Sequence, residues 1–352
     1  MLTHWCKPPA RSLWTSADHA HRVGRGVEVL TEAADQVTTY RVALFGTDES
    51  ADRVRTALYA MTAHAHPLPI IDLGNLRNPT PGFGVGLVEE LLAAGLIPLW
   101  IGGANRVVNA ARAAHQKIFT RTALCEAHPR GGQDEGEATT LTDSLRYTHL
   151  GGQAHQLPHQ RRTALDARGD TGLSLGQLRT NLERAEPLIR NADWLGVHAG
   201  VLRESCLPTV AQPSAVGLTV EELCQLAFYG GISDRLVGCS IDGWLPERDA
   251  DGRSTRAVAT VLWYFLDGVA QRKGDFPVSK THMTEYVVSP AEGAGPLTFW
   301  KSERSGRWWV EVEETARPQS QKQLLACNYE DYERAVNGTL TAYLLALLHR
   351  FV

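Results

Sequence analysis

The sequence lacks several features that would place it in a large class of proteins. No apolar stretch reaches the roughly 18 residues that a membrane-spanning helix needs, and residues 1–14 hold no continuous apolar segment typical of a signal peptide. We therefore expect a cytoplasmic protein with no membrane partner. The formal net charge is −4, so no excess of basic residues favours nucleic acid as a partner.

Common cysteine and nucleotide motifs are also missing. The six cysteines form no Cys-x-x-Cys pair, and several fall in apolar runs, which indicates buried thiols rather than disulfides or a zinc knuckle. The glycine pair Gly102 and Gly103 stands between an apolar run and a helical segment, but neither G-x-G-x-x-G nor G-x-x-x-x-G-K-[ST] is present there. A nucleotide site is therefore the weaker interpretation of this pair.

The sequence does contain short apolar runs that alternate with amphipathic segments. The runs are 41–46, 69–74, 97–103, 122–127, 146–152, 194–200 and 236–244. Apolar strands that alternate with helices predict a parallel sheet covered on both faces. The polar, glycine-bearing segment 128–144 is expected to be an exposed loop.

Three parts are expected along the chain. Residues 1–39 form an N-terminal extension, residues 40–284 the α/β domain, and residues 285–352 a tryptophan-rich hairpin and a helix packed on the same domain. The stretch "SERSG" between two aromatic runs predicts the turn of that hairpin. Its large side chains Trp300, Trp308 and Trp309 either pack on the domain or form a surface for a protein partner.

Polar side chains gather where three of the predicted strands end. Asn105 and Arg106 follow one strand; Glu126, His128 and Arg130 belong to the end of a second; His198 ends a third. Ligands of open α/β sheets bind beyond the carboxyl ends of the strands, so these side chains are candidates for one site. Glutamate and histidine are ligands of zinc and manganese.

The order of these segments resembles the ureohydrolases, namely arginase, agmatinase and formimidoylglutamase. The likeness rests on the glycine pair, the acid-x-His strand end, "WLGVHAG", "GLTVEELCQLAFYGGISD" and "TFWKSERSGRWWVEV", and spans roughly residues 40–335. It is nearest to the divergent formimidoylglutamase-like arginase-family proteins of Bacteroidetes. The resemblance implies a three-layer α/β/α fold around a mostly parallel eight-stranded sheet, and a homo-oligomer. In active members, two manganese ions share a hydroxide that attacks an amidine or guanidine carbon.

Carried onto this sequence, the resemblance implies that most metal positions have changed. Asn105 replaces a histidine; Glu126, His128 and Arg130 fall on Asp-x-His-x-Asp; His198 and Gly200 fall on Asp-x-Asp; and Gly243 falls on a glutamate that contacts substrate. Asp242 stands one residue earlier and is expected to point to the other face of its strand. Two manganese ions bring four positive charges, and one carboxylate beside a guanidinium cannot balance them.

We therefore expect a non-catalytic binding or scaffold protein without a cofactor. One alternative is a hydrolase with a single zinc or manganese ion held by Glu126, His128 and His198. A further alternative is a residual formimidoylglutamase-like hydrolase of C–N bonds in a linear amidine. Arg130 is either a solvated loop residue or a cation that occupies the vacated metal position and pairs with Glu126.

Overall fold

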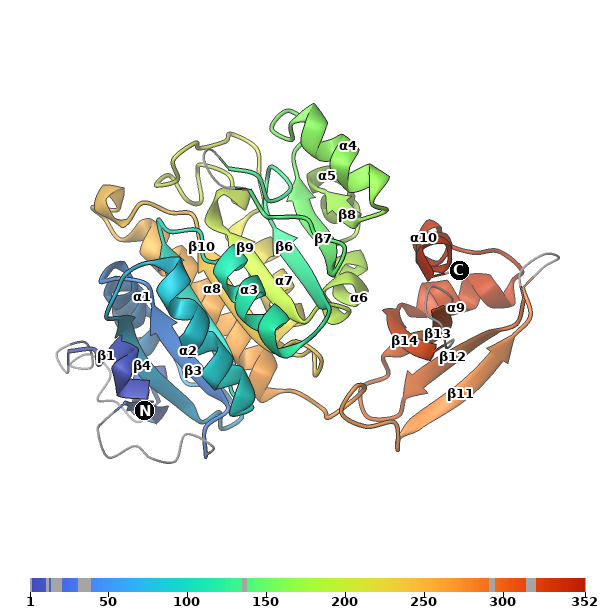
Figure 1. Ribbon diagram of the computed structural model, residues 1–352, viewed down its shortest axis with the longest axis horizontal. Helices are drawn as coiled ribbons and strands as arrows, with labels where there is room; N and C mark the ends of the chain where they lie inside the picture. The colour runs from blue at the N-terminus through green and yellow to red at the C-terminus, as the bar shows by residue number, and fades with distance from the viewer. Residues whose placement is uncertain are drawn as a thin grey trace.

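The computed structural model describes residues 2–10, 13, 21–30, 39–134, 138–290, 295–314 and 321–351. Parts of the predicted extension 1–39 and residues 135–137 of the predicted loop lie outside this description. The described chain forms a large α/β unit followed by a smaller C-terminal unit (Figure 1).

The α/β unit is built on one sheet with eight parallel strands at its centre. In spatial order they are β4 (Ile70–Leu76), β3 (Val42–Gly46), β5 (Ile97–Gly103), β10 (Gly238–Asp242), β9 (Trp194–His198), β6 (Thr122–Ala127), β7 (Leu145–Gly152) and β8 (Thr171–Ser174). Two short strands from the N-terminal segment, β1 (Cys6–Lys7) and β2 (Val27–Val29), pair with β4, and β1 runs antiparallel to it. The apolar runs of the sequence thus form a mostly parallel sheet, as predicted.

Helices cover both faces of this sheet because its strands are apolar on both sides. One buried core lies under α1 (Ser50–Tyr59), α5 (Leu175–Thr180), α6 (Ala185–Arg190), α7 (Val220–Gly231) and α8 (Arg253–Ala270). A second core lies under α2 (Pro81–Ala93), α3 (Val108–Ile118) and α4 (His159–Ala167). The two cores on opposite faces confirm the predicted three-layer arrangement.

The C-terminal unit is larger than the predicted hairpin and helix. The hairpin is present as β12 (Leu297–Ser302) and β13 (Trp308–Glu314), but β11 (Met283–Val288) and β14 (Gln321–Cys327) extend it to a four-stranded antiparallel sheet. Two helices follow, α9 (Tyr329–Val336) and α10 (Ala342–Phe351). Trp308 faces the core beneath these helices and Trp309 the opposite face of the sheet, so both rings are buried within the chain.

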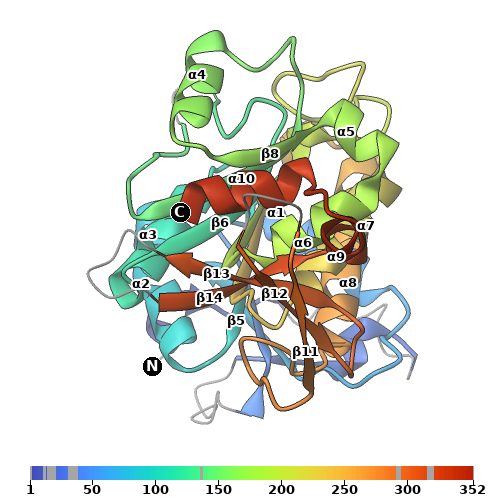
Figure 2. The ribbon, with the colours of Figure 1, turned by 90° about the vertical axis from the view of Figure 1, so that its right-hand side faces the viewer.

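The C-terminal unit is held against the α/β unit by hydrogen bonds from the last residue of α6 and the residue after it. The guanidinium of Arg190 donates to the carbonyls of Trp308 at 3.0 Å and Cys327 at 3.1 Å. The amide of Asn191 accepts from Ala326 N–H at 2.7 Å and donates to the same residue's carbonyl at 3.3 Å and to Tyr343 Oη at 2.9 Å. Helix α10 of the C-terminal unit lies beside β8, the last strand of the α/β sheet (Figure 2).

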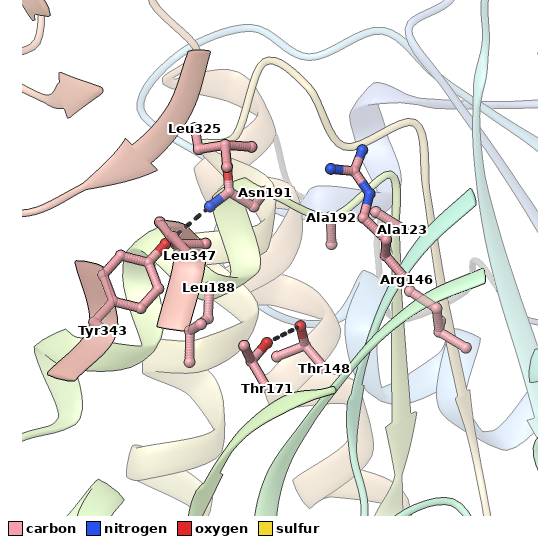
Figure 3. Close-up of a pocket in the computed structure, with 11 residues that line it drawn as sticks. Ala123, Arg146, Thr148, Thr171, Leu188, Asn191, Ala192, Leu325, Tyr343 and Leu347 are labelled. Atoms are coloured by element: carbon pink, nitrogen blue, oxygen red, sulfur yellow. Dashed lines mark hydrogen bonds between the residues drawn. The ribbon is translucent and has the colours of Figure 1, made fainter. Parts of the chain in front are cut away.

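A small cavity of about 40 Å³ remains at this joint. Tyr343 and Leu347 of α10 line one side, and Thr148 and Thr171 of β7 and β8 line another (Figure 3). The cavity is lined mainly by apolar surface. It is therefore a packing gap between the two units.

None of the helices in the described ranges is both long and apolar enough to cross a membrane.

Candidate functional site

The candidate site lies where four adjacent strands of the central sheet end. Strands β5, β10, β9 and β6 are neighbours, and Asp242 at the end of β10 is in register with Gly103 on one side and His198 on the other. Gly103 has a φ of +59°, and a Cβ there would lie 2.3 Å from Ser50 Oγ. Only glycine suits this turn, which leads the chain from β5 to Arg106.

The guanidinium of Arg106 lies at the centre of the site. Its Nη2 is 2.8 Å from Glu126 Oε1, its Nε 3.5 Å from Asp134 Oδ2 and its Nη1 3.6 Å from Asp242 Oδ1. Nη2 also donates to Thr139 Oγ1 at 3.1 Å. Only 8% of the Arg106 side chain is exposed. One buried cation therefore faces three carboxylates.

Glu126 is wholly buried and remains an anion. Its Oε2 accepts hydrogen bonds from Thr139 at 2.8 Å and Tyr147 at 2.9 Å. Burial raises the pKa of Glu126, but the Arg106 cation, His128 and the two hydroxyl donors outweigh it and bring the pKa to about 2. For Arg106 the signs are reversed: burial lowers its pKa, and the surrounding carboxylates raise it. The carboxylates have the larger combined effect, so the pKa of Arg106 is raised. The pair is thus charged at neutral pH.

Asp242 is the least well stabilised carboxylate of the three. Its Oδ2 accepts the N–H of Val107 at 3.0 Å, whereas Oδ1 has no hydrogen-bond donor. Burial raises the pKa of Asp242 to about 7, in spite of the opposing effect of Arg106. This residue was expected to point to the other face of its strand, and that prediction is wrong. The register between β10 and β5 shifts at Ile241/Asp242, and such a bulge re-aims the side chain.

The two predicted histidines converge on Asp134 rather than on Glu126. His128 Nε2 lies 3.1 Å and His198 Nε2 3.2 Å from Asp134 Oδ2. Their Nδ1 atoms accept the backbone N–H of Arg130 at 3.0 Å and of Gly200 at 3.1 Å. Burial lowers the pKa of both imidazoles, so they are neutral. An Nδ1 that accepts a hydrogen bond carries no proton, so the proton of the neutral ring is on Nε2. Both rings thus present Nε2–H to Asp134.

Arg130 does not pair with Glu126. Its Nη2 donates to Asp134 Oδ1 at 2.6 Å, and its Nη1 donates to Gln212. Of the two interpretations offered for Arg130, neither describes it: the residue is partly buried, and Arg106 makes the ion pair with Glu126. Asp134 therefore lies between two guanidinium groups and two imidazoles, with a pKa that the His128 hydrogen bond and the nearby charges lower despite the opposing effect of burial.

The segment 128–144 was expected to be exposed, and this is wrong for much of its described part. His128, Gly131, Gly132 and Thr139 are buried. Arg161 of α4 holds the segment in place by donating to the carbonyls of Gly131 at 2.8 Å and Thr139 at 3.0 Å. The glycines let the chain turn back over the sheet edge, and this brings Asp134 into the site.

The remaining positions of the predicted metal site have other contacts. Asn105 Nδ2 donates to Asp48 Oδ2 at 3.0 Å. Gly200 supplies the N–H that fixes the His198 ring. Gly243 has a φ of +91°, and a Cβ there would lie 2.4 Å from His198 Nε2. The imidazole thus fills the space that a glutamate at this position would need.

These residues do not fit a pair of manganese ions. The Arg106 guanidinium occupies the space between Glu126, Asp134 and Asp242, and a divalent ion there would face a fixed positive charge. Within the described ranges, three donor groups lie close enough for one cation: ligand atoms of His128, Asp134 and His198 are within 4.8 Å of one another. Glu126 is not in that group.

The strand-end pattern of the sequence indicates the two histidines and Glu126, but it indicates neither Asp134 nor the central place of Arg106. A usable signal was the spacing of Arg130 and Asp134, which are four residues apart in a segment with two glycines. The sequence places Arg106 only as a polar residue at a strand end. Arg106 follows Asn105, the position at which the resemblance implies a metal-binding histidine. That neighbourhood was the available signal for a cationic side chain in the site.

Known proteins resemble this chain in structure but not detectably in sequence. No known family model and no curated protein matches this sequence. Among solved structures, a Trypanosoma cruzi formiminoglutamase with Mn²⁺ is 18% identical with a TM-score of 0.62, and the match covers 68% of this chain and 96% of that one.

Two further structures agree with this comparison. Formimidoylglutamase from Bacillus subtilis is 15% identical, with a TM-score of 0.61 and coverage of 71% of this chain and 92% of that one. Agmatine ureohydrolase of Thermoplasma volcanium is 16% identical, with a TM-score of 0.57 and coverage of 73% and 97%. Identities this low establish a shared architecture, so the protein has the arginase-type fold of these ureohydrolases.

Proposed function

We propose that this protein is a divergent member of the formimidoylglutamase-like ureohydrolases that holds no manganese pair, does not hydrolyse amidines, and acts as a binding or scaffold protein. One observation carries this proposal: Arg106 lies among Glu126, Asp134 and Asp242, with its Nη2 2.8 Å from Glu126 Oε1. A paired-ion mechanism needs two cations to lower the pKa of a shared water. A guanidinium supplies a positive charge but no coordination site for that water.

The first test is metal content and turnover of the unaltered protein. The chain is expressed with added Mn²⁺, purified without chelator, and assayed for bound manganese and for hydrolysis of formimidoylglutamate, agmatine and arginine. We expect less than stoichiometric metal and no release of formamide or urea above a blank without protein. Two manganese ions per chain, or turnover of any of the three substrates, would overturn the proposal.

A second candidate is a hydrolase with one zinc ion at His128, Asp134 and His198. The convergence of their ligand atoms favours it, because two imidazoles and a carboxylate with an open position are a hydrolytic zinc arrangement. Zinc bound at Nε2 would require both rings to move their proton to Nδ1 and release the backbone N–H groups of Arg130 and Gly200. One zinc ion per chain that is lost in His198→Ala would establish this candidate over the first.

The scaffold role is proposed to involve self-association and a protein partner at the hairpin β12–β13. Trp308 and Trp309 are buried, which leaves Trp300 as the half-buried ring of the three, with Lys280 Nζ 5.1 Å from its centre. Light scattering of the wild-type protein and Trp300→Ala tests this. We expect an oligomer whose mass, or whose binding of a partner, depends on Trp300. If the wild-type protein and Trp300→Ala are both monomers and neither binds a protein partner, this part of the proposal is wrong.

A further inference from the structure

Strand β8 forms one edge of the central sheet. Among the described residues it pairs only with β7, so the backbone N–H and C=O groups along its other side have no strand partner. Residues Thr171–Ser174 include neither lysine nor proline, which commonly prevent pairing at an exposed edge. This edge can therefore accept a further strand wherever there is space beside it.

Space exists because helix α10 runs beside β8 without closing on it (Figure 2). A hollow of about 800 Å³ lies between them, and the consecutive residues 166–173 line one wall. Thr171 Oγ1 is 2.9 Å from Thr148 Oγ1 on one face of the sheet, whereas a Cβ on Gly172 would meet His149 on the other face. Side chains alternate between the two faces of a strand, yet Thr171 and Gly172 both line the hollow. The backbone edge of β8 therefore faces it.

The helix presents small side chains to this hollow. Ala342 and Ala346 lie about one turn apart on α10, and both are exposed and line the hollow. An alanine side chain has no polar atom with which to satisfy the β8 backbone. Tyr343 also lines the hollow, but its hydroxyl donates to the carbonyl of Ala326. The helix thus leaves the edge of β8 open and leaves room for a further backbone.

The hollow continues into a second one of about 360 Å³. The two hollows form one groove, here called the β8–α10 groove, because they share the lining residues Leu173, Arg184, Leu188, Ala342 and Tyr343. Both volumes lie within the range of roughly 300–1,000 Å³ that is typical of ligand sites. The leucine and alanine side chains offer apolar contact, and the charged side chains of the groove can select its ligand.

Arg184 is the cation of the groove that is open to a ligand. It lines both hollows and is exposed, and its guanidinium makes no hydrogen bond or ion pair with any residue that the structure describes. Apart from the exposed Asp166, the other charged side chains of the groove have partners within the chain, namely Arg168 with Asp170, Arg334 with Glu330, and Asp331 with Thr341. A free guanidinium favours a carboxylate, which its fork can bind through two hydrogen bonds.

We propose that the β8–α10 groove binds an extended peptide segment of another protein, which adds a strand to β8 and places an acidic side chain at Arg184. In such strand addition, backbone hydrogen bonds supply affinity and side-chain contacts supply specificity. Neither the residues of the strand-end site nor Trp300 line the groove. The inference thus goes beyond the proposed function, and its failure would leave the metal, turnover and Trp300 tests unaffected.

The first test uses synthetic hexapeptides and the full-length protein. The peptides carry a rhodamine label at the N-terminus and an amide at the C-terminus, and valine alternates with threonine except at one glutamate, which is moved through all positions. Matched peptides have glutamine or lysine in place of the glutamate. Fluorescence anisotropy measures binding. We expect glutamate at one position to bind about tenfold or more tightly than its glutamine counterpart, the effect of one charge-assisted hydrogen bond. No binding by any glutamate peptide overturns the inference.

Variants of α10 test whether the groove is the binding site. Ala346→Trp fills the groove from an exposed position, and we expect it to abolish binding of the glutamate peptide. Leu345→Trp is the matched control, because it adds the same ring at a neighbouring exposed position that lines neither hollow. Equal binding by the two variants overturns the inference. An oligomer that Ala346→Trp dissociates, with no peptide bound by the wild-type protein, would assign the groove to a second copy of the chain and also overturn it.

Two further measurements separate the contributions of charge and backbone. Arg184→Glu should bind the glutamate peptide about tenfold or more weakly and should prefer the lysine peptide. N-methylation of alternate backbone amides in the glutamate peptide leaves the protein unaltered, and only the set of methyl groups that faces β8 should abolish binding. Unchanged selectivity in Arg184→Glu, or full binding by both methylated peptides, overturns the proposed mode of recognition.

Discussion

Two buried arginines of this chain have opposite surroundings. Arg190, at the joint with the C-terminal unit, meets one carboxylate, Glu186, at 2.8 and 3.0 Å, two backbone carbonyls, and the ring of Trp309 at 4.4 Å. Arg106 meets three carboxylates and one hydroxyl, and several of the facing atoms have no hydrogen bond. The donors of Arg190 thus have well-placed acceptors, and one carboxylate pairs with its charge. Arg106 neutralises only part of the negative charge around it.

The contacts around the two side chains indicate two different roles for a buried arginine. Where neutral acceptors take most of the donors, as around Arg190, the side chain fixes the geometry between two parts of the fold. Where carboxylates exceed the cation, as around Arg106, the side chain acts mainly as a counter-charge.

The largest expected effect is that of Arg190→Met. The change leaves Glu186 with only the more distant Arg307, whose Nε is 3.7 Å away, and removes the Arg190 donors from two carbonyls. We therefore expect the free energy of unfolding to fall by about 3–5 kcal/mol. Urea denaturation followed by tryptophan fluorescence measures it. An unchanged free energy of unfolding would show that Arg190 does not hold the two units together.

A double change at the site sharpens the comparison further. Arg106→Met/Glu126→Gln should be more stable than Arg106→Met alone by roughly 1–3 kcal/mol, because the amide removes a buried charge that has lost its partner. Glutamine still offers an oxygen to Thr139 and Tyr147. Urea denaturation of both variants in EDTA checks this. If the two changes simply add, Glu126 is not the carboxylate that Arg106 neutralises.

A smaller effect is expected from Asn191→Ala at the joint. Ala326 N–H loses its acceptor, whereas the Ala326 carbonyl and the Tyr343 hydroxyl keep their bond to each other; a buried N–H left unpaired costs about 1–3 kcal/mol. Asn191→Asp is the matched control, because it keeps an acceptor for Ala326 N–H and loses only the donor. We expect its loss of stability to lie between those of the wild-type protein and the alanine variant.

The smallest effect is expected from Asn105→His. The change returns an imidazole to the position where the ureohydrolase resemblance implies one, and it removes a bond to Asp48 that is worth about 0.5–1.5 kcal/mol. We expect no gain of bound Mn²⁺, because Arg106 is still in place. Metal analysis after dialysis measures this. Stoichiometric manganese in Asn105→His would show that the missing histidine, and not the guanidinium, excludes the ion.

The sheet was predictable from the sequence because strands buried on both faces are apolar throughout. The convergence of His128 and His198 followed from the same rule, since the carboxyl ends of parallel strands lie at one edge. Asp134 was not predictable, because its segment has no periodicity and folds back through glycine turns. Asp242 was placed on the wrong face because a single register shift reverses the direction of a side chain.

The direction of Arg106 depends on a turn that composition does not encode. The positive φ of Gly103 and the contacts of the following residues decide whether the side chain enters the site or points to solvent. Strand β14 was missed for a related reason, because its sequence "QKQLLAC" lacks the aromatic and β-branched residues that identify its neighbours. Its conformation is set by pairing with β13.

The amide of Asn191 has a consequence for how the C-terminal sheet can grow. Its oxygen and nitrogen contact the N–H and carbonyl of one residue, Ala326, as the backbone of a further strand would. The amide thus takes both backbone hydrogen bonds of Ala326, so a strand from another molecule cannot pair with β14 at this residue.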